Sequence, residues 1–509
     1  MDLRTPSRFL SKLQALDILL GIVVFLCLTG LATAIYRAFL HPLSRIPGPK
    51  LYAASSLFYL AYLVTGRWPF KLKELHDKYG PVVRFAPNDV SFISASAWRE
   101  IYGHKKPGEL PYEKDQRIYR GSLTGAPNIL VADGPSHARM RRLLSHAFSE
   151  RALKGQEHVV QYYLDTFIKR LKEHSAQGLP VDVVKWYNFT TFDVLGDLAF
   201  GESFGCLEAG GYHPWVAMIF DGFELATYLQ ALKRLPNQLS WCLSWLLPKH
   251  LIANKTRHFR MSFEKAQRRM ASGNTDRDDF MSHLLRHNDD KGMTAEEVGE
   301  NSNVLIVAGS ETTATLLSGT TYCLLRWPET YQKLVREIRS TFAKEEDITQ
   351  TAVAELKYLL AALNEGLRMY PPIPSGLGRI TPAGGRFIDY YWIPEKTVVS
   401  VPHWSAYHCA QNFRDPDSFR PERWLNDSCY AGDSKDVLQP FSHGPRNCLG
   451  LNLARAESRL ILTRLLWNFD LEPEPGFESW LDQKVYLFWQ KGAINVKLKH
   501  VERKLIQGN

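Results

Sequence analysis

The sequence has few cysteines and no pairing pattern among them. Seven of its 509 residues are cysteine, they are scattered, and no two form a C-x-x-C pair. This spacing argues against a disulfide framework and a structural zinc site, and it fits a reducing compartment. The seven positions are Cys27, Cys206, Cys242, Cys323, Cys409, Cys429 and Cys448.

A strong excess of one charge is also absent. The chain has 62 Lys and Arg against 53 Asp and Glu, a formal net charge of +9. No basic stripe with interleaved aromatic residues occurs, so we expect no nucleic-acid partner. The small surplus suits an acidic protein partner or anionic lipid headgroups. Internal repeats and low-complexity stretches are absent, and 45% hydrophobic residues is the composition of an ordered protein.

Long apolar runs are limited to one, near the N-terminus. Residues 18–36 read ILLGIVVFLCLTGLATAIY without a charge, and a helix needs ~20 such residues to cross a bilayer. Basic residues and prolines follow, rather than the small-residue cleavage site of a signal peptide. We therefore expect a single-pass transmembrane anchor over residues 1–38, with its helix at about 18–36, and a stiff proline-rich hinge over residues 39–50. A shorter aromatic-rich run, WCLSWLL at 241–247, could touch a membrane surface but is expected to be core.

The remaining residues, 51–509, show no internal boundary and predict one large domain. Helical patterns dominate from about 135 to 370, and another helix is expected at 451–469. Short strand-like runs lie at 81–85, 89–94 and 397–401. The expected fold class is therefore mainly α with a minor β part.

One loop has the properties of a thiolate ligand for an iron cofactor. In the segment PFSHGPRNCLG, Cys448 stands between Arg446 and Gly450 and directly before a helical pattern. A deprotonated cysteine is an electron-donating axial ligand that favours O–O cleavage, and the start of a helix stabilises its negative charge. Gly444 and Gly450 let the backbone approach a flat macrocycle, Phe441 can exclude water, and Arg446 can pair with a carboxylate of the cofactor.

A second cluster interrupts an apolar helical run, NVLIVAGSETTATLL. Small residues at Ala308 and Gly309 leave room for dioxygen, and the Thr312 hydroxyl can bond back to the Ala308 carbonyl and open the helix locally. Glu311 and Thr312 then form an acid–alcohol pair able to relay protons. A surface helix with a polar face fits poorly, because apolar residues flank the cluster on both sides.

These two segments resemble the cytochrome P-450 superfamily. The loop matches the pattern F-x-x-G-x-R-x-C-x-G without a gap, and the helix matches (A/G)-G-x-(D/E)-T-T. The resemblance extends over roughly residues 40 to 500. It implies the P-450 fold, haem b as cofactor, Cys448 as the axial ligand of the haem iron, and Glu311 and Thr312 as the catalytic pair. The alternative for the loop, a buried free cysteine, does not account for the helix motif.

The resemblance also implies a buried ion network that supports the ligand loop. Glu365 and Arg368 in NEGLRMYPP share one helix face, and on their own would be an ordinary surface pair. They precede a segment that resembles the family's P-E-R-F motif, with Trp424 in the Phe position. Glu365, Arg368 and Arg423 are the residues implied in the network, and their role is structural.

Further haem contacts are implied at three positions. His137 and Arg141 lie four apart on one helical face, where the family places partners of the haem propionates. Arg379 follows the glycine-containing stretch IPSGLG and is another propionate candidate.

The implied activity is a haem-thiolate monooxygenase that hydroxylates or otherwise oxidises an apolar small molecule. By resemblance, the pocket walls come from the loop near 110–130, the helix before Ala308, the stretch 373–377 and the turn 486–489. In texture the chain is similar to fungal microsomal members of secondary metabolism, on the evidence of HPLSRIPGPK and FDVLGDLAFGESF.

Electrons are expected from outside the chain, since no G-x-G-x-x-G turn and no room for a flavin domain are found. The resemblance implies NADPH as the source, a separate NADPH-cytochrome P-450 reductase as the partner, and a catalytic domain on the cytosolic side of the endoplasmic reticulum membrane. Sequons at Asn188, Asn254 and Asn426 would then be chance matches.

Two other readings remain open. A haem-thiolate isomerase or dehydratase would use the same cysteine without activating oxygen, but it would not need Glu311 and Thr312. A non-enzymatic haem sensor would need neither a proton-relay groove nor an enclosed apolar pocket.

Overall fold

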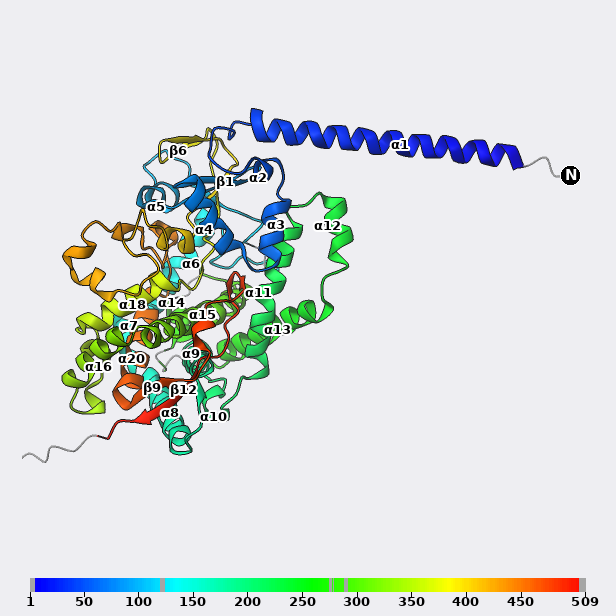
Figure 1. Ribbon diagram of the computed structural model, residues 1–509. Helices are drawn as coiled ribbons and strands as arrows, with labels where there is room; N and C mark the ends of the chain where they lie inside the picture. The colour runs from blue at the N-terminus through cyan, green and yellow to red at the C-terminus, as the bar shows by residue number, and fades with distance from the viewer. Residues whose placement is uncertain (1–4, 120–123, 274–276, 278, 288–291, 503–509) are drawn as a thin grey trace, which may run out of the picture.

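Helices make up most of the structure and the sheets are small, so the expected fold class is confirmed. The structure is a computed structural model and describes residues 5–119, 124–273, 277, 279–287 and 292–502. Figure 1 shows the helices gathered around the long central helix α15, with the N-terminal helix α1 projecting from the domain.

The helices begin and end as follows. They are α1 Thr5–Ile35, α2 Lys50–Ala54, α3 Leu57–Val64, α4 Trp68–Tyr79, α5 Ala95–Tyr102, α6 Gly134–Ala147, α7 Glu150–Gly155, α8 Glu157–Ala176, α9 Val183–Phe200, α10 Cys206–Ala209, α11 Pro214–Leu232, α12 Asn237–Ser244, α13 Lys249–Ala271, α14 Phe280–His287, α15 Ala295–Arg326, α16 Pro328–Thr341, α17 Gln350–Val353, α18 Lys357–Met369, α19 His403–Tyr407 and α20 Leu451–Asn468.

The strands form two small sheets and two hairpins. A five-stranded sheet has the order β1-β2-β8-β5-β3, in which only β2 and β8 run parallel, and a three-stranded sheet has the order β4-β12-β9. The hairpins are β6–β7 and β10–β11. The strands are β1 Val82–Ala86, β2 Asp89–Phe92, β3 Glu113–Lys114, β4 Val181–Asp182, β5 Arg379–Ile380, β6 Arg386–Ile388, β7 Tyr391–Ile393, β8 Val398–Ser400, β9 Phe469–Pro473, β10 Val485–Tyr486, β11 Phe488–Trp489 and β12 Asn495–His500.

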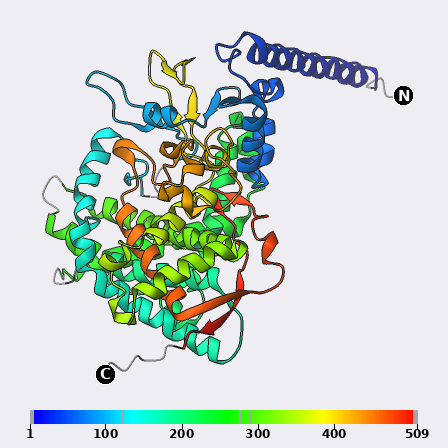
Figure 2. The same cartoon turned by 60° about the vertical axis from the view of Figure 1, so that its left-hand side comes forward.

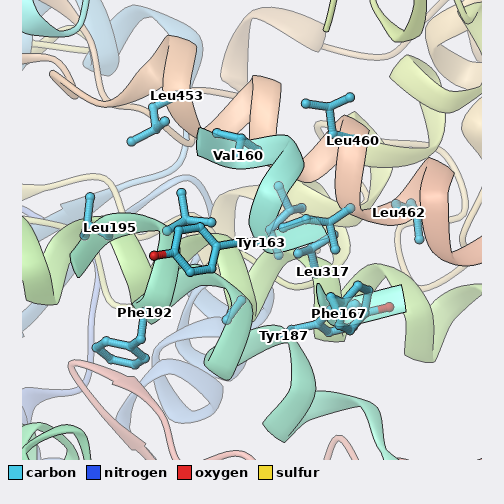
Figure 3. Packing of buried hydrophobic residues seen from close by; sticks show 14 of the residues in the cluster. Val160, Tyr163, Phe167, Tyr187, Phe192, Leu195, Leu317, Leu453, Leu460 and Leu462 are labelled. Atoms are coloured by element: carbon cyan, nitrogen blue, oxygen red, sulfur yellow. The ribbon is translucent and has the colours of Figure 1, made fainter. Parts of the chain in front are cut away.

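The main core lies where α8, α9, α15 and α20 meet, as Figure 3 shows from close by. Leu317 of α15 and Leu460 of α20 are fully buried there, and burying one such side chain stabilises the fold by roughly 1.5–3 kcal/mol. α9 approaches α15 so closely that a Cβ added at Gly309 would lie 2.7 Å from Leu195. Gly309 therefore allows α9 to pack closely against α15, a role that the sequence analysis did not assign to it.

The N-terminal helix is longer than expected. The sequence predicts a helix at about 18–36, whereas α1 starts at Thr5 and a π-helical turn, Tyr36–Leu40, continues it. Polar residues before the apolar run are compatible with helix, and apolarity alone could not mark its start. Within the described residues, one helix is long and apolar enough to cross a membrane, over Leu16–Leu40, and the domain covers little of it (Figures 1 and 2).

The interpretation of WCLSWLL as core is wrong. The run lies on α12 and the turn after it, and its side chains are exposed by 65% at Trp241, 74% at Trp245 and 77% at Leu246. We call these three residues the α12 patch. An apolar run marks only a surface that avoids water, and the sequence alone does not say whether protein or lipid covers it.

Candidate active site

The loop that carries Cys448 is a tight turn held by its own backbone. The Cys448 amide donates to the Phe441 carbonyl (2.8 Å), and the Asn447 amide donates to the Gly444 carbonyl (3.1 Å). Phe441 is half-buried and packs against the main core. These contacts place the sulfur just before the first turn of α20.

Gly444 is required by the close approach of a neighbouring helix end. Its φ is +75°, and an added Cβ would collide with the Tyr102 carbonyl and lie 2.9 Å from Gly103. A side chain here would be strained and would push the loop away from α5. A Cβ added at Gly450 would meet no protein atom within 4 Å. The space beside Gly450 is therefore open to a bound group.

Cys448 is exposed, although enough protein atoms lie near its sulfur to affect the protonation of the thiol. Burial raises the pKa of the Cys448 thiol, while the Gly450 amide and the Arg141 charge oppose that rise. The thiolate is thus favoured when a further positive centre, such as a metal ion, meets the sulfur.

Arg141 of α6 braces this loop directly. Its guanidinium donates to the Asn447 carbonyl (2.5 Å) and to Asn447 Oδ1 (2.7 Å). In this structure Arg141 therefore contacts the residue that precedes the cysteine, which is a different contact from the propionate pairing expected from the resemblance.

Four basic side chains converge beside the loop. Lys114, His137, Arg379 and Arg446 act on one another, since burial and then the neighbouring charges lower the pKa of Lys114 to about 6 and that of His137 to about 4. Burial and the Arg379 charge also lower the pKa of Arg446. The carboxylate that acts on Arg446, Asp133, is exposed and caps α6. The group therefore lacks a buried counter-charge among its recorded neighbours and fits a dianionic ligand.

Lys114 was missed by sequence reasoning. It comes from the two-residue strand β3, is buried, and donates to the carbonyls of Ile129 (3.4 Å) and Leu130. A lone lysine in a loop segment carries no recognisable pattern, and only the fold brings it to the other cations. Arg446 donates to the Ala132 carbonyl (3.1 Å) and Arg379 to the Tyr119 hydroxyl (2.8 Å), so both are oriented by protein contacts.

This donor set fits haem. One cysteine sulfur can supply an axial ligand for iron, and the basic side chains beside it can hold the two propionate carboxylates of the macrocycle. The open side of Gly450 leaves room for a flat group.

The helix motif on α15 has the expected local bond. Thr312 Oγ1 donates to the Ala308 carbonyl (2.7 Å), and Ala308 is exposed although most of α15 is buried. A threonine that bonds back in this way competes with the regular helix bonds and loosens the helix at that point. The bare stretch of α15 at Ala308 and Thr312 is therefore the place where a small molecule can meet the helix.

Glu311 is placed differently from the expected acid–alcohol pair. Consecutive helix residues point about 100° apart, and among the hydrogen bonds of the described residues none joins Glu311 to Thr312. Glu311 forms a buried ion pair with Lys491, which comes from the loop before β12. Sequence reasoning missed Lys491, because it lies 180 residues away and in no motif.

The buried ion network joins the three residues that the sequence predicts. Glu365 accepts from Arg368 (2.9 and 2.8 Å) and from Arg423 (3.2 Å), and all three side chains are fully buried. Burial would raise the pKa of Glu365, but the two guanidinium groups and the Arg420 amide hold it below its usual value. The network is therefore ionic in the folded protein.

Two further members of the network were not predicted. Trp424 donates its indole N–H to Glu365 (2.9 Å), a hydrogen bond that the family's Phe at this position could not make. Asp433 forms an ion pair with Arg423.

The network is connected to the cysteine loop through Tyr407. Arg368 donates to the Tyr407 carbonyl (2.8 Å), and the Tyr407 hydroxyl accepts from the Gln439 amide (2.9 Å). This path connects the network to the residues just before Phe441.

Comparison with known proteins gives consistent results. The model of the cytochrome P-450 family matches residues 47–496. The cytochrome P-450 monooxygenase efuB of Hormonema carpetanum is 44% identical over 478 residues, covering 93% of this chain and 94% of the relative. The cytochrome P-450 monooxygenase astJ of Aspergillus oryzae is 44% identical over 474 residues, covering 92% of this chain and 94% of the relative.

A relative with a named reaction is similar to the same degree. The trichothecene C-4 hydroxylase of Trichoderma arundinaceum is 44% identical over 496 residues, covering 94% of this chain and 97% of the relative.

We expect R423M to lower the free energy of unfolding by about 3–5 kcal/mol, because Glu365 and Asp433 stay buried but lose the guanidinium group that pairs with both. Denaturant unfolding followed by tryptophan fluorescence measures this. R170M is the matched control, since Arg170 pairs with exposed Glu208 (2.7 Å) and its loss should cost under about 1 kcal/mol. Equal losses in the two variants would show that the network contributes little.

We expect K114M to weaken haem retention by roughly tenfold to 100-fold, the equivalent of ~1.5–3 kcal/mol for a hydrogen bond to a charged group. Haem released to an excess of apomyoglobin over time gives the dissociation rate. K106M, which removes an exposed lysine from the same segment, should release haem at the parent rate. Parent-like release from K114M would remove Lys114 from the haem site.

Proposed function

Because the chain belongs to the cytochrome P-450 family, we propose that it is a haem-thiolate monooxygenase that oxidises an apolar secondary metabolite of a fungus, typically by hydroxylation. The observation that carries the proposal is the combination of two sites, the Cys448 loop and the loosened helix at Ala308 and Thr312. The first alone would suit any haem-thiolate protein, whereas the second is a requirement of oxygen chemistry.

Each part of the site has a task in this reaction. When bound, haem supplies the iron chemistry by which dioxygen is activated with two electrons. Cys448 would ligate the metal, while Lys114, His137, Arg379 and Arg446 would hold the propionates. Thr312 holds a hydroxyl proton at the opening in α15, where it can be exchanged during the reaction. Arg141 and the buried network keep the cysteine loop rigid, and their role is structural.

The substrate class follows from the walls expected around this opening. In the stretch 373–377, Ile373, Ser375 and Leu377 are half-buried in alternation with buried residues, so one side of it faces away from the core. Leu487, at the turn between β10 and β11, is half-buried with φ +68°. In the loop near 110–130, residues 120–123 lie outside the described residues. The walls named here are mostly aliphatic and suit an apolar molecule. The similarity to a trichothecene hydroxylase supports a substrate of similar size to a trichothecene.

Electrons come, in this proposal, from NADPH through a separate reductase that docks on the cysteine side. Helix α1 anchors the chain in the endoplasmic reticulum membrane with the domain in the cytosol. The α12 patch gives the domain a second contact with the lipid.

Asn188 is buried and donates to the Tyr212 hydroxyl (3.0 Å), which argues against its use as a glycosylation site in the folded chain.

We expect T312A to consume NADPH at a rate near the parent's while product formation falls about 100-fold, the range typical of a lost proton-transfer group. Peroxide should account for the difference. Product, NADPH and peroxide are measured together with reductase present. T256A is the control, because Thr256 makes the same backbone bond to Ile252 (3.1 Å) on an exposed helix. Product formed without NADPH or reductase would favour the isomerase or dehydratase reading, and a T312A variant with full product yield would contradict the proposal.

We expect W241S/W245S to weaken vesicle binding of a chain that starts at Tyr36 by about tenfold or more, because an aromatic side chain buries roughly 150–250 Å². Co-sedimentation with vesicles containing anionic lipid measures this. Y162S removes an equally exposed aromatic from α8 and should leave binding unchanged. Equal binding by both variants would mean that the α12 patch does not touch lipid.

A further inference from the structure

A buried lysine and a buried glutamate form an ion pair against α15. Lys491 Nζ donates to Glu311 Oε1, and the two side chains are 3% and 0% exposed. Lys491 also donates to Thr315 Oγ1 (2.7 Å), which in turn donates to Glu311 Oε1 (3.2 Å). These contacts draw the Glu311 carboxylate toward Thr315, which lies one helical turn after Glu311.

The other carboxylate oxygen remains free. Glu311 Oε2 is buried and has no hydrogen-bond partner within the described part of the chain. A carboxylate can accept about four hydrogen bonds, so a buried oxygen with none is a strong acceptor for a proton or a water. Glu311 thus has one oxygen fixed by Lys491 and one available.

The loop that carries Lys491 is held at both ends. The Gln490 amide donates to the Lys484 carbonyl (2.8 Å), and the Gly492 carbonyl accepts from the Trp480 indole (2.8 Å). At its end, the Ile494 amide donates to Asp182 Oδ1 (3.2 Å). The ammonium group is therefore presented to α15 from a fixed backbone rather than from a flexible surface loop.

Lys491 is the charged partner of Glu311, and the other titratable groups that act on it are phenols. Tyr370, just after α18, donates to Gln483 (2.7 Å), and Tyr212, before α11, accepts from Asn188. Burial raises the pKa of both phenols, so they stay neutral. Without Lys491 the Glu311 carboxylate would be buried with no opposite charge, a state that proteins avoid by taking up a proton.

The pKa values of Glu311 and Lys491 are shifted toward each other. Burial raises the pKa of Glu311 although Lys491 opposes the rise, and burial lowers the pKa of Lys491 although Glu311 opposes the fall. The two proton affinities are thereby brought closer together than in water.

We propose that Lys491 is a positioning residue for oxygen activation, which keeps the Glu311 carboxylate ionised and turned toward Thr315 so that its free oxygen can take up a proton. This inference rests on the proposed function, since it assigns the control of the acid in the proton relay. A mutation of Lys491, which lies in a loop between strands and in no motif, should therefore change the protonation of Glu311 on α15.

The first test reads the protonation of Glu311 directly and does not need turnover. Infrared difference spectra at neutral pH compare each protein with its E311Q counterpart. K491M minus K491M/E311Q should show the carbonyl band of a protonated carboxyl, and the parent minus E311Q should lack it. K491R keeps a cation and should resemble the parent. A protonated band already present in the parent, or absent in K491M, overturns the proposal.

The second test follows coupled turnover against pH with reductase and NADPH. Product requires ionised Glu311, so it is lost as the pH falls through the Glu311 pKa. K491M raises that pKa and moves the loss to higher pH, so that product at neutral pH falls on the order of 100-fold. K491R should keep the parent profile, and so should K497M, whose lysine pairs with Glu474 at the surface (3.2 Å).

A K491M profile equal to the parent's, or a K491R profile shifted like that of K491M, would overturn the proposal. If K491M fails to fold, the double variant K491M/E311Q, which removes both charges, should fold and match the low product yield of E311Q at each pH. A product yield of the double variant well below that of E311Q counts against the proposal. An absence of product from the parent would instead contradict the proposed function, and the infrared comparison would still decide the role of Lys491.

Discussion

A cysteine sulfur held at the start of a helix sets the requirements that the surrounding structure meets. The sulfur must stay in place, stay out of bulk water and face a positive centre. The backbone bond from Cys448 to Phe441 and the bracing of Asn447 by Arg141 hold the loop from within and from α6. Gly444 allows the loop to lie against the end of α5, where any side chain would collide.

The buried charged side chains form three groups, and these differ in whether positive and negative charges are equal in number. The network around Glu365 is balanced, because two guanidinium groups meet two carboxylates, those of Glu365 and Asp433. The pair of Lys491 and Glu311 is balanced as well. The basic groups around His137 are not, because burial and their neighbouring charges lower the pKa values of His137 and Lys114, and a bound anion would favour their charged forms. The balanced groups therefore stabilise the fold, whereas the group around His137 is the one that an anionic ligand can complete.

The sequence predicts the parts of the site that are local in the chain. The Cys448 loop, the bond from Thr312 to Ala308, and the pair of Glu365 and Arg368 each lie within a few residues, so spacing alone indicates their geometry. Lys114, Asp433 and Lys491 could not be predicted, because each reaches the site from a distant segment without a pattern of its own. Similarly, the fold class follows from periodicity, whereas the exposure of the α12 patch depends on what covers it.

The central claim is that Cys448 is the thiolate ligand of a bound haem, and the absorption spectrum of the reduced carbon monoxide adduct tests it most directly. The position of the Soret band in this adduct reports the ligand opposite the carbon monoxide. We predict a thiolate-type Soret band for the parent protein and a histidine-type band for C448H. A histidine-type band in the parent, or a thiolate-type band that persists in C448H, would contradict the account.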